Sequence, residues 1–268
     1  MSRTASARIV SQAAPGTRLV YAVAAVRDPG YDAFEERLVV TIDGREVEPE
    51  EVPDHHGGRL HVVETDDAAE VVLDYSLRVE GRADPAPIDA ADLIRYVRPS
   101  RYCESDKLLP TAYAQFGTLR GVELVQEVSA WVTEQLGYVS GSSRGSDGSV
   151  DTLLARRGVC RDFAHLVVSL LRAKDVPARL AAAYAPQLRP MDFHAVAEAY
   201  VDGAWYVVDA TGLAPRQGLV RISTGADSSD TAFLSTVGGS LQLRSMKVDA
   251  GSDETLEDPG ARALVQLR

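Results

Sequence analysis

The type of secondary structure that the sequence predicts changes once, near residue 85, and this change constrains the fold more than any other feature. Before it, short alternating or β-rich runs are separated by turn signals such as Pro15-Gly16 and Asp43-Gly44. Short strands at this spacing are typical of a β-sandwich, and Asp-Gly is a favoured two-residue hairpin turn. The runs predict strands within residues 7–10, 17–26, 37–42, 59–64 and 70–79.

The sequence beyond this change reads as an α+β domain. Residues 81–87 (GRADPAP) contain two prolines in three positions, which stop both helices and sheet ladders, so we interpret them as a linker. The division predicts a β-sandwich domain over residues 1–85 and a second domain over residues 86–268. Apolar spacing predicts helices over 121–136, from about 150, and from 160 to about 174, followed by strands at 178–184, 194–201 and 204–211. Weaker apolar runs lie at 219–222 and 241–248.

Composition disfavours several classes of partner. The 268 residues carry a formal net charge of -11, which disfavours nucleic acids and anionic membranes. No apolar run is long enough to span a bilayer, and the N-terminus lacks the apolar core of a secretory signal. With only two cysteines, Cys103 and Cys160, a disulfide scaffold is not expected. We therefore expect a cytoplasmic protein.

Cys160 is the strongest candidate for a reactive residue. Gly158 precedes it by two positions, and an apolar helical stretch follows it directly. This context places the sulfur at a helix N-terminus, where the helix dipole and free N–H groups stabilise a thiolate. The same N–H groups can stabilise an oxyanion. The alternative is a buried structural cysteine that packs with Phe163 and Leu166, as free cysteines commonly do.

A histidine and an aspartate come together through a predicted hairpin. If Asp202-Gly203 is a two-residue turn, His194 and Asp209 project from the same face of the two strands as diagonal neighbours. Alone, each would be read as a structural side chain. Together they can form an imidazole–carboxylate hydrogen bond, which fixes the tautomer and favours the imidazolium. A thiolate beside an oriented imidazolium is the working state of a cysteine nucleophile.

These blocks resemble the bacterial transglutaminase-like family of the papain-like superfamily. The resemblance rests on GVCRDFAH at 158–165, DFH at 192–194 and WYVVDAT at 205–211. Residues 99–106 (PSRYCESD) are similar to the segment that opens the family's catalytic domain, and the β-rich start is similar to its N-terminal sandwich. The resemblance implies an α+β fold with a papain-like catalytic domain behind a sandwich, and a triad of Cys160, His194 and Asp209.

The implied function is acyl transfer on a protein or peptide amide. Water as the acceptor gives a peptidase or amidase, and an amine gives a transglutaminase. Hydrolysis is slightly favoured because nothing in the sequence marks an amine site. The alternative is an inactive module of the same fold that binds a protein or peptide. No cofactor or metal ion is expected, since zinc-type spacings and an EF-hand calcium loop are missing from the sequence.

Several other residues lie in or near the implied site. Val196 stands where the family usually has tryptophan, so the wall of the cleft is expected to differ. Trp131 and Tyr138 are both candidates for a second oxyanion donor, and either can equally be a core aromatic. The Gly/Ser loop at 141–148 either borders the cleft or is merely mobile.

The remaining candidates are expected to be structural. Cys103 falls before the predicted core helices. His165 lies five residues after Cys160, which is not the same helix face, so we interpret it as a core or surface histidine. Arg161 and Asp162 are expected to support the start of the helix.

Overall fold

Two antiparallel sheets packed face to face form a β-sandwich, as the N-terminal sequence predicts. The computed structural model describes all residues from 1 to 268. Alternate side chains of the first strand, such as Ala5, Ala7 and Ile9, are buried because successive residues of a strand point to opposite faces. The larger sheet has the order β15 (Leu241–Ser252), β1 (Ser2–Ala13), β7 (Ala69–Gly81), β3 (Tyr31–Ile42) and β4 (Arg45–Val47). The smaller has the order β14 (Leu234–Val237), β2 (Thr17–Tyr21), β6 (Arg59–Thr65) and β5 (Glu50–Pro53).

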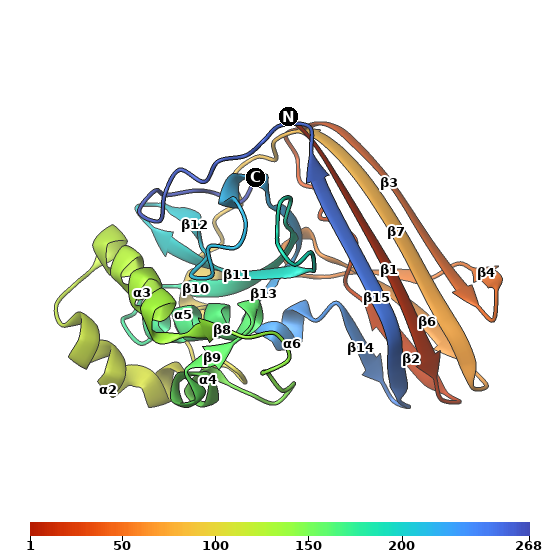
Figure 1. Cartoon of the computed structure of the whole chain (residues 1–268), viewed down its shortest axis with the longest axis horizontal. Helices are drawn as coiled ribbons and strands as arrows, with labels where there is room; N and C mark the ends of the chain where they lie inside the picture. Colours follow the sequence, from red (N-terminus) through yellow and green to blue (C-terminus); the bar gives the residue numbers. More distant parts are fainter.

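The predicted division into residues 1–85 and 86–268 needs correction. The chain returns to the sandwich after residue 233, where β14 pairs with β2 and β15 pairs along the length of β1 (Figure 1). Without β15, the edge of β1 would present a long row of unpaired backbone groups. The prediction treats each domain as one continuous stretch of the chain. In the structure, strands from residues 1–85 and from residues 86–268 lie in the same sheets.

The second part is a four-stranded antiparallel sheet with helices against it. Its order is β12-β11-β10-β13. The strands are β10 (Ala178–Tyr184), β11 (His194–Val201), β12 (Ala204–Val208) and β13 (Val220–Gly225). Helix α5 (Cys160–Arg172) is buried along almost its whole length, between this sheet and helices α2 (Ser105–Phe116) and α3 (Gly121–Gln135). Figure 1 shows these helices on the side away from the sandwich.

Short elements complete this part. The helices are α1 (Ala90–Arg95), α4 (Ser149–Ala155) and α6 (Ser228–Thr231), and β8 (Gly137–Tyr138) pairs in parallel with β9 (Arg157–Gly158). Two 3-10 turns, His55–Gly57 and Arg216–Gly218, lie in connections. None of the helices is long and apolar enough to cross a membrane.

The predicted α+β class is confirmed, with differences in detail. The predicted helices at 121–136 and 160–174 correspond to α3 and α5, and the predicted strand at 204–211 ends earlier, at Val208. Helix α2 was not predicted. Pro110 lies inside it, and a proline within a run of residues is ordinarily a sign that no helix passes through.

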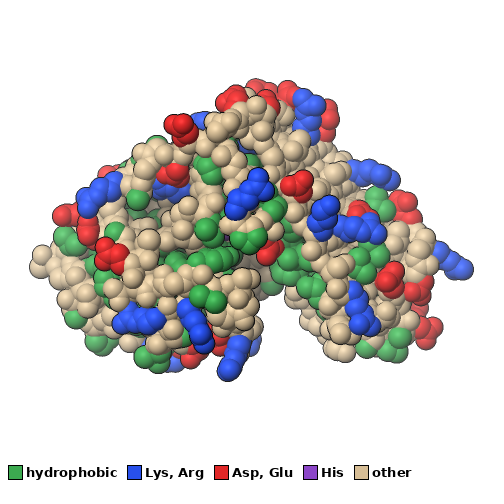
Figure 2. Space-filling model, in the orientation of Figure 1, with side chains coloured by type: hydrophobic (Ala, Val, Ile, Leu, Met, Phe, Trp, Pro, Cys, Tyr) green, Lys and Arg blue, Asp and Glu red, His purple; other side chains and the backbone are tan.

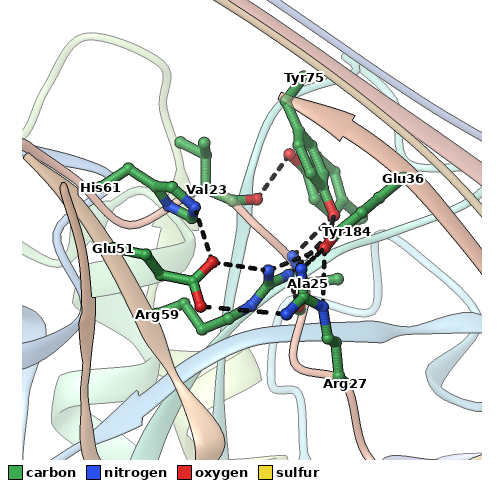
Figure 3. Close-up of polar contacts among 9 residues, drawn as sticks. All are labelled: Val23, Ala25, Arg27, Glu36, Glu51, Arg59, His61, Tyr75 and Tyr184. Atoms are coloured by element: carbon green, nitrogen blue, oxygen red, sulfur yellow. Dashed lines mark hydrogen bonds and ion pairs between the residues drawn. The ribbon is translucent and has the colours of Figure 1, made fainter. Parts of the chain in front are cut away.

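The two parts are joined by a buried polar network. Arg59 donates to Glu36 at 2.7 and 2.8 Å, and the Tyr75 hydroxyl donates to the same carboxylate at 2.8 Å. Tyr184, from β10 of the second part, donates its hydroxyl proton to the carbonyl oxygen of Val23 at 2.9 Å (Figure 3). The N–H of Ala25 donates to the Tyr75 hydroxyl at 3.0 Å, and Arg59 donates to the carbonyl oxygen of Ala25 at 2.6 Å, so the segment that follows β2 is bonded to both the sandwich and the second sheet.

Candidate active site

Cys160 is the first residue of helix α5, as predicted. The N–H of Val159 donates to Asp162 Oδ2 at 2.8 Å, so the carboxylate one turn ahead holds the start of the helix. This bond requires close approach at Gly158, where a Cβ would lie 2.6 Å from Cβ of Asp162. The glycine before the cysteine is thus explained by the helix start, and the predicted supporting role of Asp162 is confirmed.

The Gly/Ser loop is held against this helix start. Asp162 Oδ1 accepts a hydrogen bond from Ser143 Oγ at 2.9 Å. Arg161 donates to the carbonyl oxygen of Arg144 at 2.7 Å and also contacts Ser143. The loop borders the cavity in front of Cys160, which decides between the two expectations stated for it.

His194 and Asp209 meet as the predicted hairpin requires. Val201 pairs with Ala204 across the Asp202-Gly203 turn, and the ladder continues back to Ala197 and Val208. Asp209 follows the last paired residue of β12, and its Oδ2 lies 2.6 Å from Nε2 of His194.

The second carboxylate oxygen of Asp209 is held by Thr211. The backbone N–H of Thr211 donates to Oδ1 at 2.9 Å, and its hydroxyl donates to the same atom at 2.7 Å. Both oxygens of the carboxylate are therefore bonded, and its orientation toward the imidazole is fixed. The sequence reading missed Thr211, although an aspartate followed two residues later by threonine is a common turn signal.

The electrostatics of the pair favour an imidazolium. Burial lowers the pKa of His194, but the charge of Asp209, the hydrogen bond to it and the adjacent Cys160 outweigh burial and raise the pKa to about 10. Burial raises the pKa of Asp209, but His194 and Thr211 outweigh it, so the net pKa is below its ordinary value. Nδ1 of His194 is buried and makes no hydrogen bond of normal geometry, although the Cys160 side chain lies close enough to raise the pKa of the ring. One ring nitrogen is thus committed to orientation and the other is free.

Cys160 and His194 line one cavity of about 490 Å³. Both parts of the molecule contribute to it, because Leu234 of β14 and Met246 of β15 belong to the sandwich sheets. Figure 2 shows a hollow between the two lobes with apolar side chains around it. Val196 is buried in a separate apolar cluster and does not line this cavity, contrary to the expectation that it alters the wall of the cleft.

Two further candidates are structural, as expected. Cys103 is fully buried, and burial raises the pKa of its thiol to about 12. His165 is also fully buried, its ring stacks on Tyr102 with centroids 5.4 Å apart, and its Nε2 accepts from the N–H of Ser228 at 3.2 Å. Burial lowers the pKa of His165 to about 3, so it stays neutral and serves the core.

The two aromatic candidates for a second donor are placed differently. Trp131 packs edge-on against Phe116 in the helical core. Tyr138 is brought beside the start of helix α5, because β8 pairs with β9 directly before Cys160. Burial and the neighbouring charge of Cys160 raise the pKa of Tyr138 to about 12, which keeps its hydroxyl protonated and able to donate.

Comparison with known proteins gives the class of this fold. Residues 112–210 match the transglutaminase-like superfamily. The structure resembles that of a candidate cysteine protease from Cytophaga hutchinsonii with a TM-score of 0.86 and 34% identity, over 95% of this chain and 91% of that one. The chain therefore belongs to the transglutaminase-like superfamily.

Curated relatives match over shorter stretches. An uncharacterized protein of Mycobacterium leprae is 27% identical over 118 residues, which is 41% of this chain and 42% of that protein. An uncharacterized protein of Mycobacterium tuberculosis is 38% identical over 63 residues, 24% of this chain and 20% of that protein. The chain thus spans less than half the length of the curated relatives that it matches.

Proposed function

We propose that this protein hydrolyses protein or peptide amides with Cys160 as nucleophile, His194 as acid and base, and Asp209 as the residue that orients His194. The observation that carries the proposal is the buried 2.6 Å contact between His194 and Asp209, which leaves Nδ1 of the imidazole free in a site shared with Cys160. Nδ1 of His61 and Nδ1 of His165 are also buried without a partner, so the bond to Asp209 and the cavity shared with Cys160 are what distinguish His194.

The reaction follows from this arrangement. The Cys160 thiolate attacks the substrate carbonyl carbon, and a tetrahedral oxyanion forms. As the C–N bond breaks, the His194 imidazolium gives its proton to the leaving amine, and a thioester to Cys160 remains. Water then attacks the thioester while His194 accepts its proton. The C–S bond breaks, the acid is released and the thiolate returns.

The oxyanion has two proposed donors. The first is the backbone N–H of Cys160, which is unpaired within the helix because it belongs to the first turn of α5. The second is the Tyr138 hydroxyl.

A thiolate nucleophile must stay reduced, and both cysteines of the chain are free. We therefore expect the enzyme to act in a reducing compartment such as the cytoplasm.

The proposal is tested by turnover of a dye-labelled, unfolded casein, with and without a fluorescent primary amine. We expect the wild type to release new peptide ends, and Cys160→Ala to lose at least about 10⁴-fold in rate, as expected for loss of a nucleophile. Cys103→Ala, at the buried cysteine, is the matched control and should keep its activity. Undiminished cleavage by Cys160→Ala would exclude the mechanism. Amine incorporation without new peptide ends would show a transglutaminase. If neither product forms, the binding-module alternative would be favoured.

A further inference from the structure

Strand β14 differs from the other edge strands of the three larger sheets. It pairs with β2 on one side only, and its sequence, LSTV, contains no charged residue and no proline. Its last three residues are exposed, and Val237 keeps 63% of its surface accessible. An uncharged and uncovered edge is a template for another strand, and proteins ordinarily protect such edges.

The other edges carry that protection. At the far side of the same sheet, β5 has the sequence EEVP, with two acidic residues and a proline. In the larger sheet, β4 carries Arg45 and Glu46, and β15 carries Arg244 and Lys247. In the second sheet, the C-terminal segment bonds to β12, and the segment after β2 bonds to β13. Among the three larger sheets, β14 is the one edge without such protection.

The open edge leads into the candidate active site. Leu234, the first residue of β14, and Phe233 before it line the same cavity as Cys160 and His194. The ring of Phe233 stacks on that of Phe193, with centroids 5.3 Å apart, next to His194 in sequence. In Figure 1, β14 lies on the sandwich side of the hollow seen in Figure 2. The edge is therefore continuous with the reactive site.

Backbone groups of β14 are available on this edge. The carbonyl oxygen of Phe233 accepts from the N–H of Ala22 at 3.1 Å, which makes these two residues a hydrogen-bonded pair. In an antiparallel ladder such pairs alternate, so residues 235 and 237 also bond toward β2. The N–H and C=O groups of Leu234 and Thr236 consequently point toward the open side.

We propose that an extended segment of the polypeptide substrate adds to β14 as a further strand and is thereby directed across Cys160. The inference rests on the proposed hydrolysis for the identity of the bound chain as substrate. Main-chain bonds to residues 234 and 236 give affinity without regard to sequence, and the cavity near Phe193 and Phe233 takes an apolar side chain. The substrate class is then an unfolded or looped polypeptide with an apolar residue near the scissile bond, in place of a small amide.

The test measures binding without turnover. The full chain carries Cys160→Ala, and the probes are fluorescein-labelled decapeptides with leucine at alternate positions and threonine or lysine between them, which span about 33 Å when extended. Thr236→Pro removes the outward N–H without removing a bond to β2. We expect it to raise Kd about tenfold, the equivalent of one or two backbone hydrogen bonds. Thr236→Ala keeps the N–H and should change Kd less than about twofold.

A second measurement leaves the protein unchanged. Each peptide amide is methylated in turn, and we expect affinity to fall only at alternate positions, since only those face β14. The inference would be overturned if the peptides do not bind, or if the loss of affinity on methylation does not alternate along the peptide. Equal Kd values for folded Thr236→Pro and Thr236→Ala would overturn it as well. Concentration-dependent dimers that Thr236→Pro abolishes, with no peptide binding, would assign the edge to self-pairing and overturn it too. Failure of hydrolysis at Cys160 would leave the Kd pattern intact, and failure of strand addition would leave cleavage intact.

Discussion

Strand β11 carries two buried ionic groups four residues apart, and they are completed to different degrees. Glu198 bonds through both oxygens, to Arg221 at 2.8 Å twice and to Arg179 at 2.9 Å. His194 uses one nitrogen for Asp209 and leaves the other without a partner. Both groups are fully buried, so burial alone does not separate them.

The two groups differ in the polar atoms that remain without a hydrogen bond: none on the carboxylate of Glu198, and one ring nitrogen on His194. Burial raises the pKa of Glu198, but Arg179 and Arg221 outweigh this effect and lower the pKa to about 2. Glu198 is therefore ionised near neutral pH. Both oxygens of Glu198 are bonded, and the one buried nitrogen of its partners that lacks a hydrogen bond, Nη1 of Arg179, lies 3.7 Å from the carboxylate of Asp92, so the carboxylate of Glu198 is held rigidly. A network with one open position beside a cysteine can exchange a proton with a substrate. We therefore expect changes at Glu198 to affect stability and changes at His194 to affect the proposed reaction.

The largest expected effect comes from Asp209→Asn. The amide keeps the shape of the side chain but removes the charge that holds the imidazolium, so we expect the turnover rate to fall about 10⁴-fold, as in related triads. Unfolding by urea should show that the fold is kept. A variant with nearly full activity would put Asp209 outside the chemistry and break the comparison.

Glu198→Gln should act on stability. It leaves Arg179 and Arg221 buried with too little negative charge around them, which costs about 3–5 kcal/mol of unfolding free energy. A depressed pKa means that the stabilisation is present above the unfolded carboxyl pKa, near 4.5, and is lost as pH falls through about 2. Urea titrations at pH 7 and pH 3 check both points. The opposite pattern, with lost activity and unchanged stability, would contradict the assignment.

Gly158→Ala tests the start of the nucleophile helix. The new Cβ would lie 2.6 Å from that of Asp162, so the bond from Val159 N–H must lengthen and Cys160 must move. Overpacking of this kind costs about 1–3 kcal/mol. Gly137→Ala is the matched control, since its added carbon would meet only a carbonyl oxygen at 3.8 Å. Thermal unfolding and turnover are compared, and equal behaviour of the two variants would contradict the explanation of Gly158.

The smallest effect is a shift in pH dependence. The imidazolium of His194 must be present to protonate the leaving amine, so kcat/KM should decline as pH rises through about 10. Because the folded pKa is raised, the stability that it contributes is present below the unfolded value near 6.5 and is lost as pH rises through about 10. In Asp209→Asn this alkaline decline should move toward lower pH. A decline at the same pH in both proteins would show that another group controls it.

Local sequence features predicted the His194–Asp209 contact and the helix start at Cys160 because both depend on short-range geometry. The Asp202-Gly203 turn determines which residues of β11 and β12 face one another, and the glycine two residues before Cys160 marks a tight helix start. The residues that these features bring together are at most 15 positions apart, so the features can be read directly from the sequence. The proposed triad could therefore be written down before the fold was known.

The missing parts depend on contacts between distant segments. No local pattern shows that β15 pairs with β1, more than 200 residues earlier, or that Met246 and Leu234 line the cavity of Cys160. Likewise, the uncharged sequence of β14 acquires meaning only when its pairing partner and its open side are known. Long-range pairing is decided by the whole sandwich, so sequence reading assigned these residues to the wrong half.

The two cysteines allow the most direct test of the proposal that Cys160 is a thiolate paired with the imidazolium of His194. Native protein is treated with iodoacetamide at pH 6, where an ordinary thiol is protonated, and the labelled cysteine is mapped by mass spectrometry. We expect rapid labelling of Cys160, which lines the cavity, and none of Cys103, which is fully buried and whose pKa burial raises to about 12. His194→Ala should slow the labelling of Cys160 at this pH, because the thiolate loses its imidazolium. Equal labelling of both cysteines, labelling only after denaturation, or a rate that His194→Ala leaves unchanged would contradict a thiolate–imidazolium pair at this site.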